Sequence, residues 1–160
     1  MIGPIVFIMA NAAAVFTGAA NILGVSDKRR NYGLIYFPLT LLLFLILQYQ
    51  GILPTIACTI GVLVMGYGDG FAALIGRKWG KRKLNIPSGG KTWLGTLVMF
   101  LVSFLITFVV LMIASLSLGV AFGVALLVAV GSAFVEAITP LGLDNLTVPL
   151  LAAFLVGVFV

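Results

Sequence analysis

The sequence contains no histidine, a single cysteine and few charged residues, and each scarcity excludes a class of chemistry. Without histidine, the chain has no imidazole for acid–base catalysis or for binding a metal ion. Cys58 has no second cysteine with which to form a disulfide within the chain. Charged residues make up 8% of the sequence and hydrophobic residues 62%, whereas soluble globular domains contain about 25% and about 45–50%. This composition excludes an ordinary soluble enzyme and predicts a membrane protein.

The hydrophobic residues form long continuous runs, each close to the length of a bilayer crossing. A crossing helix needs about 20 apolar residues, and continuous rather than alternating hydrophobicity indicates helices. We therefore predict an all-α, polytopic transmembrane helical bundle with about six membrane helices, forming one integral membrane domain over residues 1–160. The predicted spans are approximately 3–24, 34–49, 53–75, 93–114, 118–138 and 146–160. Because the last span is short and the first has no charged flank, we expect sequence to be missing at one or both ends.

The basic residues predict how the bundle is oriented. They gather in segments 25–33 and 76–92, which two predicted helices separate, so both segments lie on one side of the membrane. Two further helices return segment 139–145 to the same side. Because loops rich in Lys and Arg stay in the cytoplasm, we expect these three loops to face it. The positive charge is too localised, in too apolar a chain, to indicate a nucleic-acid partner.

Asp69 is the most conspicuous residue because it lies inside the third apolar run. A charge at membrane depth costs about 2.5–3.5 kcal/mol on insertion scales, so such a residue is usually functional or bonded to a partner. If the helix continues, Ala73, Gly76 and Gly80 share its face and allow another helix or a ligand to approach closely. We interpret Asp69 as a metal or proton ligand, with a structural carboxylate bonded to a neighbouring helix as the alternative.

The loop after this run is basic in its first half and rich in glycine in its second. The positive-inside rule and anionic lipid account for Arg77, Lys78 and Arg82. The second half places backbone N–H groups, hydroxyls and a lysine just before a predicted helix start, which favours an anion. It is no Walker A loop, because Asn85 stands where that pattern has its first glycine. We predict a phosphate site formed by Ser88, Gly89, Gly90, Lys91 and Thr92.

The segment 136–149 carries two further carboxylates, Glu136 and Asp144. Pro140 ends the fifth helix, and Asp144 or Asn145 could simply cap the sixth. The predicted topology nevertheless places these carboxylates on the same side of the membrane as the two sites above. Carboxylate and amide oxygens are the ligands that Mg²⁺ prefers. A divalent ion beside a lysine and a glycine-rich backbone is the equipment of phosphoryl transfer.

Two motifs resemble those of the CTP-dependent lipid kinases, the family of dolichol kinase, phytol kinase and the CTP-using diacylglycerol kinase. Residues 68–96 resemble G-D-x-x-A-x-x-x-G-x-x-x-G followed by K-[ST]-x-x-G-[ST], and residues 136–149 resemble E-x-x-x-P-x-G-x-D-N-x-x-x-P. The likeness extends over approximately residues 31–155. Phosphatidate cytidylyltransferases, in the same superfamily, share the first motif, but their histidine-containing C-terminal signature is absent, which favours a kinase. The Arg-Lys…His element usual near the N-terminus of these kinases is also absent, as expected of a truncated or inactive form.

The resemblance implies transfer of the γ-phosphoryl group of CTP to a membrane lipid alcohol (a polyprenol, phytol or diacylglycerol), with Mg²⁺ as cofactor. It implies catalytic roles for Asp69, Lys91 and Asp144. The metal ligands would be Asp69, Glu136, Asp144 and Asn145. The nucleotide would be bound by Gly76, Gly80, Lys81, Lys83, Ser88, Gly89, Gly90, Lys91 and Thr92. The alternatives are a phosphatidate cytidylyltransferase and a transporter or lipid-binding membrane protein without enzymatic activity.

Overall fold

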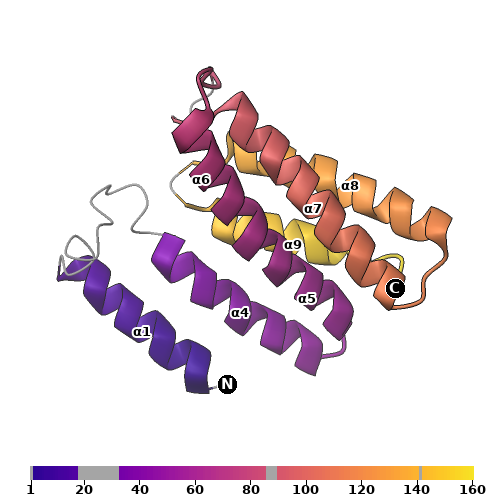
Figure 1. Cartoon of the computed structure of the whole chain (residues 1–160). Coiled ribbons are helices and arrows are strands. Elements are labelled where there is room, and N and C mark those ends of the chain that lie inside the picture. Colours follow the sequence, from indigo (N-terminus) through magenta and orange to yellow (C-terminus); the bar gives the residue numbers. More distant parts are fainter. Residues whose placement is uncertain (1, 18–32, 86–89, 141) are drawn as a thin grey trace.

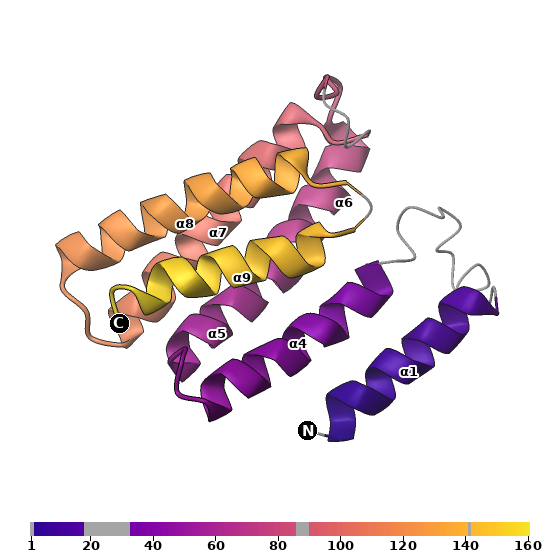
Figure 2. The ribbon, with the colours of Figure 1, turned by 180° about the vertical axis from the view of Figure 1, so that it is seen from behind.

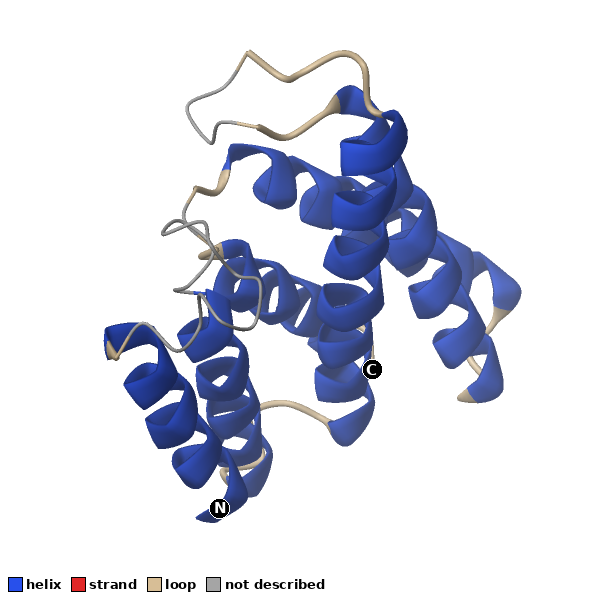
Figure 3. Ribbon diagram, turned by 60° about the vertical axis from the view of Figure 1, so that its left-hand side comes forward, coloured by secondary structure: helices blue, strands red, loops and turns tan. Residues whose placement is uncertain are grey.

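The computed structural model describes residues 2–17, 33–85, 90–140 and 142–160, and the regular structure of these ranges is helical (Figures 1 and 3). The predicted all-α class is therefore confirmed. The helices in chain order are α1 (Ile2–Phe16), α4 (Gly33–Tyr49), α5 (Thr55–Leu63), the π-helical η1 (Val64–Asp69), α6 (Gly70–Trp79), α7 (Trp93–Ile113), α8 (Leu118–Ile138) and α9 (Asp144–Gly157).

Helices α5, η1 and α6 form one continuous rod of 25 residues, and this rod, α7 and α8 are each long and apolar enough to cross a membrane. Helices α4 and α9 are apolar but have 17 and 14 residues, and α1 has 15. At about 1.5 Å per residue these three helices are shorter than the hydrocarbon core of about 30 Å. Each of the six predicted spans thus contains a helix, and three of these helices reach full spanning length within the described residues.

Three predicted ends were wrong or extend beyond the described residues. The third span continues to Trp79 rather than ending at residue 75, because Arg77 and Lys78 suit the negative end of a helix and Gly80 stands at the cap. The sixth begins at Asp144, whose carboxylate suits the positive end, and Leu143 occupies the N-cap position predicted for Asp144 or Asn145. The first helix ends at Phe16, and its predicted extension to residue 24 falls outside the described residues.

The connections lie at two opposite ends of the bundle, as the loop pattern predicted. The α6–α7 and α8–α9 connections meet at one end, whereas the short α4–α5 and α7–α8 connections and both termini lie at the other (Figures 1 and 2). The polar loops that carry the candidate site residues therefore come together at a single end of the bundle.

Helix α9 lies in the middle of the bundle, where it contacts α4, α5, η1 and α8. Small side chains permit this close packing. At Gly61 of α5, an added Cβ would lie 2.6 Å from the carbonyl oxygen of Pro149 in α9. Ala152 and Ala153 of α9 are fully buried. Helix α8 likewise buries a row of alanines, Ala121, Ala125, Ala129, Ala133 and Ala137.

A proline inside α9 ties this helix to α4. Pro149 has no N–H group, so it leaves the carbonyl oxygen of Asn145, four residues earlier, without its usual helical partner. The buried hydroxyl of Thr40 in α4 lies 2.7 Å from this oxygen and donates to it. The N-x-x-x-P spacing thus creates an acceptor that a neighbouring helix fills.

An apolar groove with a volume of about 380 Å³ lies between α4 and α5. Its walls come from two turns of each helix, and it occupies the part of the bundle that the apolar runs place in the membrane. The lining residues are Leu41, Phe44, Leu45, Gln48, Cys58, Thr59, Val62 and Leu63.

Candidate functional site

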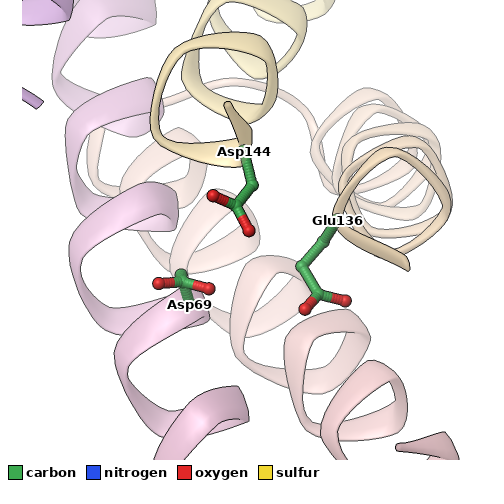
Figure 4. Close-up of side chains that lie close together, drawn as sticks. All are labelled: Asp69, Glu136 and Asp144. Atoms are coloured by element: carbon green, nitrogen blue, oxygen red, sulfur yellow. The ribbon is translucent and has the colours of Figure 1, made fainter. Parts of the chain in front are cut away.

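Three carboxylates from distant parts of the sequence meet at the end of the bundle that carries the polar loops (Figure 4). Asp69 is the last residue of η1, Glu136 lies in the last turn of α8, and Asp144 is the first residue of α9. One oxygen atom from each side chain lies within 4.8 Å of the other two. Glu136 and Asp144 are buried, and Asp69 is half-buried.

The helix ends explain why a cation suits this place. The carboxylate of Glu136 lies at the C-terminal end of α8, where the helix dipole and the unpaired carbonyl groups favour positive charge. Asp69 is presented by η1, and short π-helical segments are rare and frequently occur at functional sites. Gly68 allows η1 to approach α7 closely, since an added Cβ would lie 2.8 Å from the sulfur of Met99.

Lys91 forms the centre of the site. Its Nζ atom lies 2.7 Å from Oδ2 of Asp144 and 2.8 Å from Oε1 of Glu136. It also donates to the main-chain oxygen of Glu136. Pro140, four residues after Glu136, has no N–H group to donate to that oxygen. The oxygen is therefore free to accept from Lys91, just as Pro149 leaves the main-chain oxygen of Asn145 free to accept from Thr40.

The surroundings of Lys91 keep it charged. Burial of the ammonium group disfavours its charge, but the carboxylates of Asp144 and Glu136 more than offset this, so the pKa of Lys91 is raised above 10.5. Because the raised pKa belongs to the folded state, the attraction between the ammonium and the two carboxylates stabilises the fold. This stabilisation is fully present below pH 10.5 and is lost only as the pH rises through the raised pKa. Lys91 is therefore a protonated donor at neutral pH.

The loop before α7 holds Lys91 in place by pairing back on itself. Lys83 and Thr92 form an isolated antiparallel bridge, and the N–H of Leu84 donates to the carbonyl of Lys91 at 2.8 Å. Gly90 has a φ angle of +97°, a conformation that favours glycine. This pairing directs Lys91 toward the carboxylates while Gly90 supplies the turn that precedes it.

Thr92 caps α7 and packs among three glycines. Its Oγ1 atom accepts the N–H of Gly95 at 3.1 Å. An added Cβ would lie 2.8 Å from this Oγ1 at Gly76, 2.5 Å at Gly80 and 3.2 Å at Gly95. Of the small face predicted for the third span, Gly76 makes a close contact with α7, whereas Gly80 lies just after the end of α6 and packs against Thr92. These glycines fix the start of α7 and thereby Lys91.

The structure brings four of the predicted site residues into direct proximity, namely Asp69, Lys91, Glu136 and Asp144. The amide nitrogen of Asn145 lies instead against Gly33 at the beginning of α4. Among the predicted nucleotide-binding residues, Lys81 and Lys83 are exposed, Gly90 is exposed, and Gly76, Gly80 and Thr92 pack against one another. Ser88 and Gly89 lie outside the described residues.

Sequence reasoning missed the roles of the two motif prolines and of Thr40. A proline inside a helix or just after its end was a usable signal, because it leaves the carbonyl group four residues earlier without a helical donor. The direct pairing of Lys91 with Glu136 and Asp144 had no comparable signal. Glu136 and Asp144 lie 45 and 53 residues after Lys91 in the sequence. The predicted topology indicated only that all three lie on the same side of the membrane.

The donor set fits a divalent cation. The three carboxylates and one ammonium leave an excess of two negative charges in a largely buried place. The Oε2 atom of Glu136 is buried and has no hydrogen-bond partner among the residues that the structure describes, although buried polar atoms are nearly always paired. Oxygen-only ligands of this kind suit Mg²⁺ better than a softer metal.

No family model and no solved structure matches the chain. A curated protein from Synechocystis sp., named phytol kinase, is 37% identical to it over 156 residues. The chain is homologous to this lipid kinase. The resemblance to the lipid kinases that the two motifs indicated is thereby confirmed. The aligned region covers 96% of the chain and 66% of the phytol kinase, so the chain spans slightly less than two thirds of its relative's length.

Proposed function

We propose that this chain forms the membrane-embedded catalytic part of a lipid-alcohol kinase, which transfers the γ-phosphoryl group of CTP to a long-chain alcohol such as phytol in a Mg²⁺-dependent reaction. The observation that carries the proposal is the cluster of Asp69, Glu136 and Asp144 around Lys91 at the polar end of an apolar bundle. The name of the 37% identical relative supports an alcohol as acceptor. CTP as donor follows from the motif resemblance.

The residues of the cluster divide the chemistry. Asp69, Glu136 and Asp144 would hold Mg²⁺, which neutralises the charge of the transferred phosphoryl group. The alcohol oxygen would bond to the γ-phosphorus as the bond to the β-phosphate oxygen breaks and CDP leaves. The hydroxyl proton would pass to a carboxylate, Asp69 or Asp144, acting as general base.

The nucleotide would lie over the loop that precedes α7. Lys81 and Lys83 are exposed there and would attract the phosphates. Gly90 would offer its backbone N–H group, together with Ser88, Gly89 and Thr92. Because loops rich in Lys and Arg are kept in the cytoplasm, we propose that this loop faces the cytoplasm, where the nucleotide is found.

The groove between α4 and α5 offers a place for the hydrocarbon chain of the acceptor. It begins at Leu41, next to Thr40, whose hydroxyl is bonded to the residue after Asp144. On the opposite wall Leu63 precedes Asp69 by six residues of one rod, or about 9 Å. An alcohol with its hydroxyl at the carboxylates could thus extend its apolar chain along the groove.

A label-transfer assay tests the proposal. The protein in lipid nanodiscs receives Mg²⁺, phytol, a polyprenol, diacylglycerol and phosphatidate, with CTP labelled at either the γ- or the α-phosphate. Label entering a lipid alcohol only from the γ position is the expected result. Label entering phosphatidate from the α position would identify a cytidylyltransferase instead. No transfer from either position, at any alcohol, would overturn the assignment of a kinase to this chain.

A further inference from the structure

Lys91 has no donor left for a phosphate group in the described arrangement. An ammonium group has three N–H bonds. The three acceptors of Lys91 are Oδ2 of Asp144, Oε1 of Glu136 and the main-chain oxygen of Glu136. Its side chain is only 19% exposed. A lysine held in this way cannot contact a nucleotide without leaving at least one of these partners.

The same oxygens are those that a divalent cation would need. Oδ1 of Asp144 already accepts the N–H of Asn145 at 3.0 Å, so Oδ2 is the oxygen that this side chain offers most readily. Lys91 lies 2.7 Å from that atom. A divalent cation coordinated by Oδ2 would lie close to the ammonium and repel it.

We propose that Lys91 is a displaceable internal cation. It neutralises Glu136 and Asp144 until a divalent ion binds, and binding of the ion then releases its amine toward the phosphates of the nucleotide. This inference rests on the proposed function, because it assigns an order to the metal and nucleotide of that same site. The unpartnered Oε2 of Glu136 gives the incoming ion a first contact that does not require Lys91 to have moved.

If Lys91 and the metal ion exchange, removing the amine should change metal binding and nucleotide binding in opposite directions. This distinguishes the exchange from a purely structural ion pair. Removing the amine takes away a competitor for the metal, so the metal alone should bind more tightly. Removing it also takes away a phosphate ligand, so the nucleotide should bind more weakly. A lysine that only stabilises the fold, or that supports the metal ligands, would weaken both equilibria together.

The first experiment measures Mn²⁺ binding to the protein in nanodiscs by electron paramagnetic resonance, without nucleotide. We expect Lys91→Met to bind Mn²⁺ more tightly than the unaltered protein by about 5- to 150-fold, the usual range for coupled sites. Lys78→Met, which removes an exposed lysine stacked on Trp79 at 4.6 Å, serves as the matched control and should leave the affinity unchanged. In the presence of Mn²⁺, Lys91→Met should bind CTP more weakly than both the unaltered protein and Lys78→Met.

The second experiment uses the unaltered protein, so it does not depend on the variant folding. Acetylation of Lys91 by an activated ester, measured by peptide mass spectrometry relative to Lys78, should increase when Mn²⁺ is added. Unchanged acetylation, or equal or weaker Mn²⁺ binding in Lys91→Met, would show that the amine and the ion do not exchange, and the metal site would stand. Absence of Mn²⁺ binding in both proteins would overturn the exchange and the metal site together, while the label-transfer assay would still decide the kinase assignment.

Discussion

The three carboxylates of the site carry more negative charge than one lysine can neutralise. Like charges this close oppose one another in a place with little water, so the arrangement costs stability. Clusters that retain such a cost are found preferentially at functional sites. Glu136 and Asp144 are buried and pair with Lys91, whereas Asp69 is half-buried and belongs to the rod that lines the apolar groove. It is therefore the residue at which function and stability should separate most clearly.

We expect Asp69→Asn to abolish function without lowering stability. Loss of a general base costs about 10²- to 10⁴-fold in rate, whereas loss of one of several like charges should leave the Tm unchanged or raise it. Phosphorylation of phytol and thermal unfolding in the same detergent would check both parts. Asp27→Asn, which neutralises the one acidic residue of the sequence outside the cluster, is the control and should keep its activity. Full activity in Asp69→Asn would exclude Asp69 from both roles.

Gly80 should be a residue of packing rather than of direct phosphate contact. An alanine Cβ there would lie 2.2 Å from the carbonyl oxygen of Gly76 and 2.5 Å from Oγ1 of Thr92, and overpacking of this kind costs about 1–3 kcal/mol. Gly80→Ala should therefore lower the Tm and displace the loop of Lys91. Gly123→Ala in α8, where nothing lies within 4 Å of the new Cβ, should keep or raise the Tm. Equal Tm values for the two variants would contradict this assignment.

At the scale of elements, hydrophobic runs and helix propensities were sufficient for much of the fold. The positions, order and alternating direction of the predicted spans depend on local composition, and the structure has a helix in each of the six, three of them of spanning length within the described residues. What local composition could not predict were the contacts between helices, because these depend on how the helices pack. The structure brings four charged residues of the predicted site together, Asp69, Lys91, Glu136 and Asp144. Asn145 lies against Gly33 instead, and Thr92 caps α7. The π-helical η1 was not predicted either, since its residues have no distinguishing pattern.

The tie between α4 and α9 should depend on Pro149. Thr40→Val leaves the carbonyl of Asn145 buried without a donor, which costs about 1–3 kcal/mol. Pro149→Ala restores an N–H group four residues after Asn145, so Thr40→Val should cost less in that background. A double-mutant cycle of unfolding free energies in mixed micelles measures the difference. Equal costs in both backgrounds would show that the hydroxyl of Thr40 does not replace the missing helical bond.

At the scale of the whole molecule, the bundle combines a charged end with an apolar groove along its side. This combination matches a ligand that has a polar head on a long hydrocarbon body. The groove lies between α4, the helix that contacts α1, and α5, which belongs to the rod that carries Asp69. Its occupancy by the acceptor can be tested independently of the chemistry at the charged end.

We expect Val62→Trp, which fills the groove, to raise the KM for phytol while leaving the phosphorylation of a short, water-soluble allylic alcohol unchanged. Each methylene excluded from the groove costs about 0.8 kcal/mol, so loss of two raises KM by roughly tenfold. Val109→Trp places the same side chain on the exposed face of α7 and should change neither substrate. A KM for phytol that stays the same in Val62→Trp would exclude the groove as the acceptor's binding place.

The orientation of the bundle determines which compartment supplies the nucleotide, and thiol labelling can measure it. Cys58 is the sole cysteine of the sequence, so Cys58→Ser gives a thiol-free background. Asn85→Cys then marks the α6–α7 connection and Ser117→Cys the α7–α8 connection, and these connections lie at opposite ends of the bundle (Figure 1). Both positions are exposed. The end of the bundle that carries Asn85 is also the basic one, with Arg77, Lys78, Lys81, Arg82 and Lys83. The positive-inside rule therefore places this end in the cytoplasm. A membrane-impermeant maleimide should then label Ser117→Cys in intact cells and Asn85→Cys only after permeabilisation. The reverse pattern would place the carboxylate cluster away from cytoplasmic CTP and would overturn the proposed donor, even if the cluster binds a metal ion.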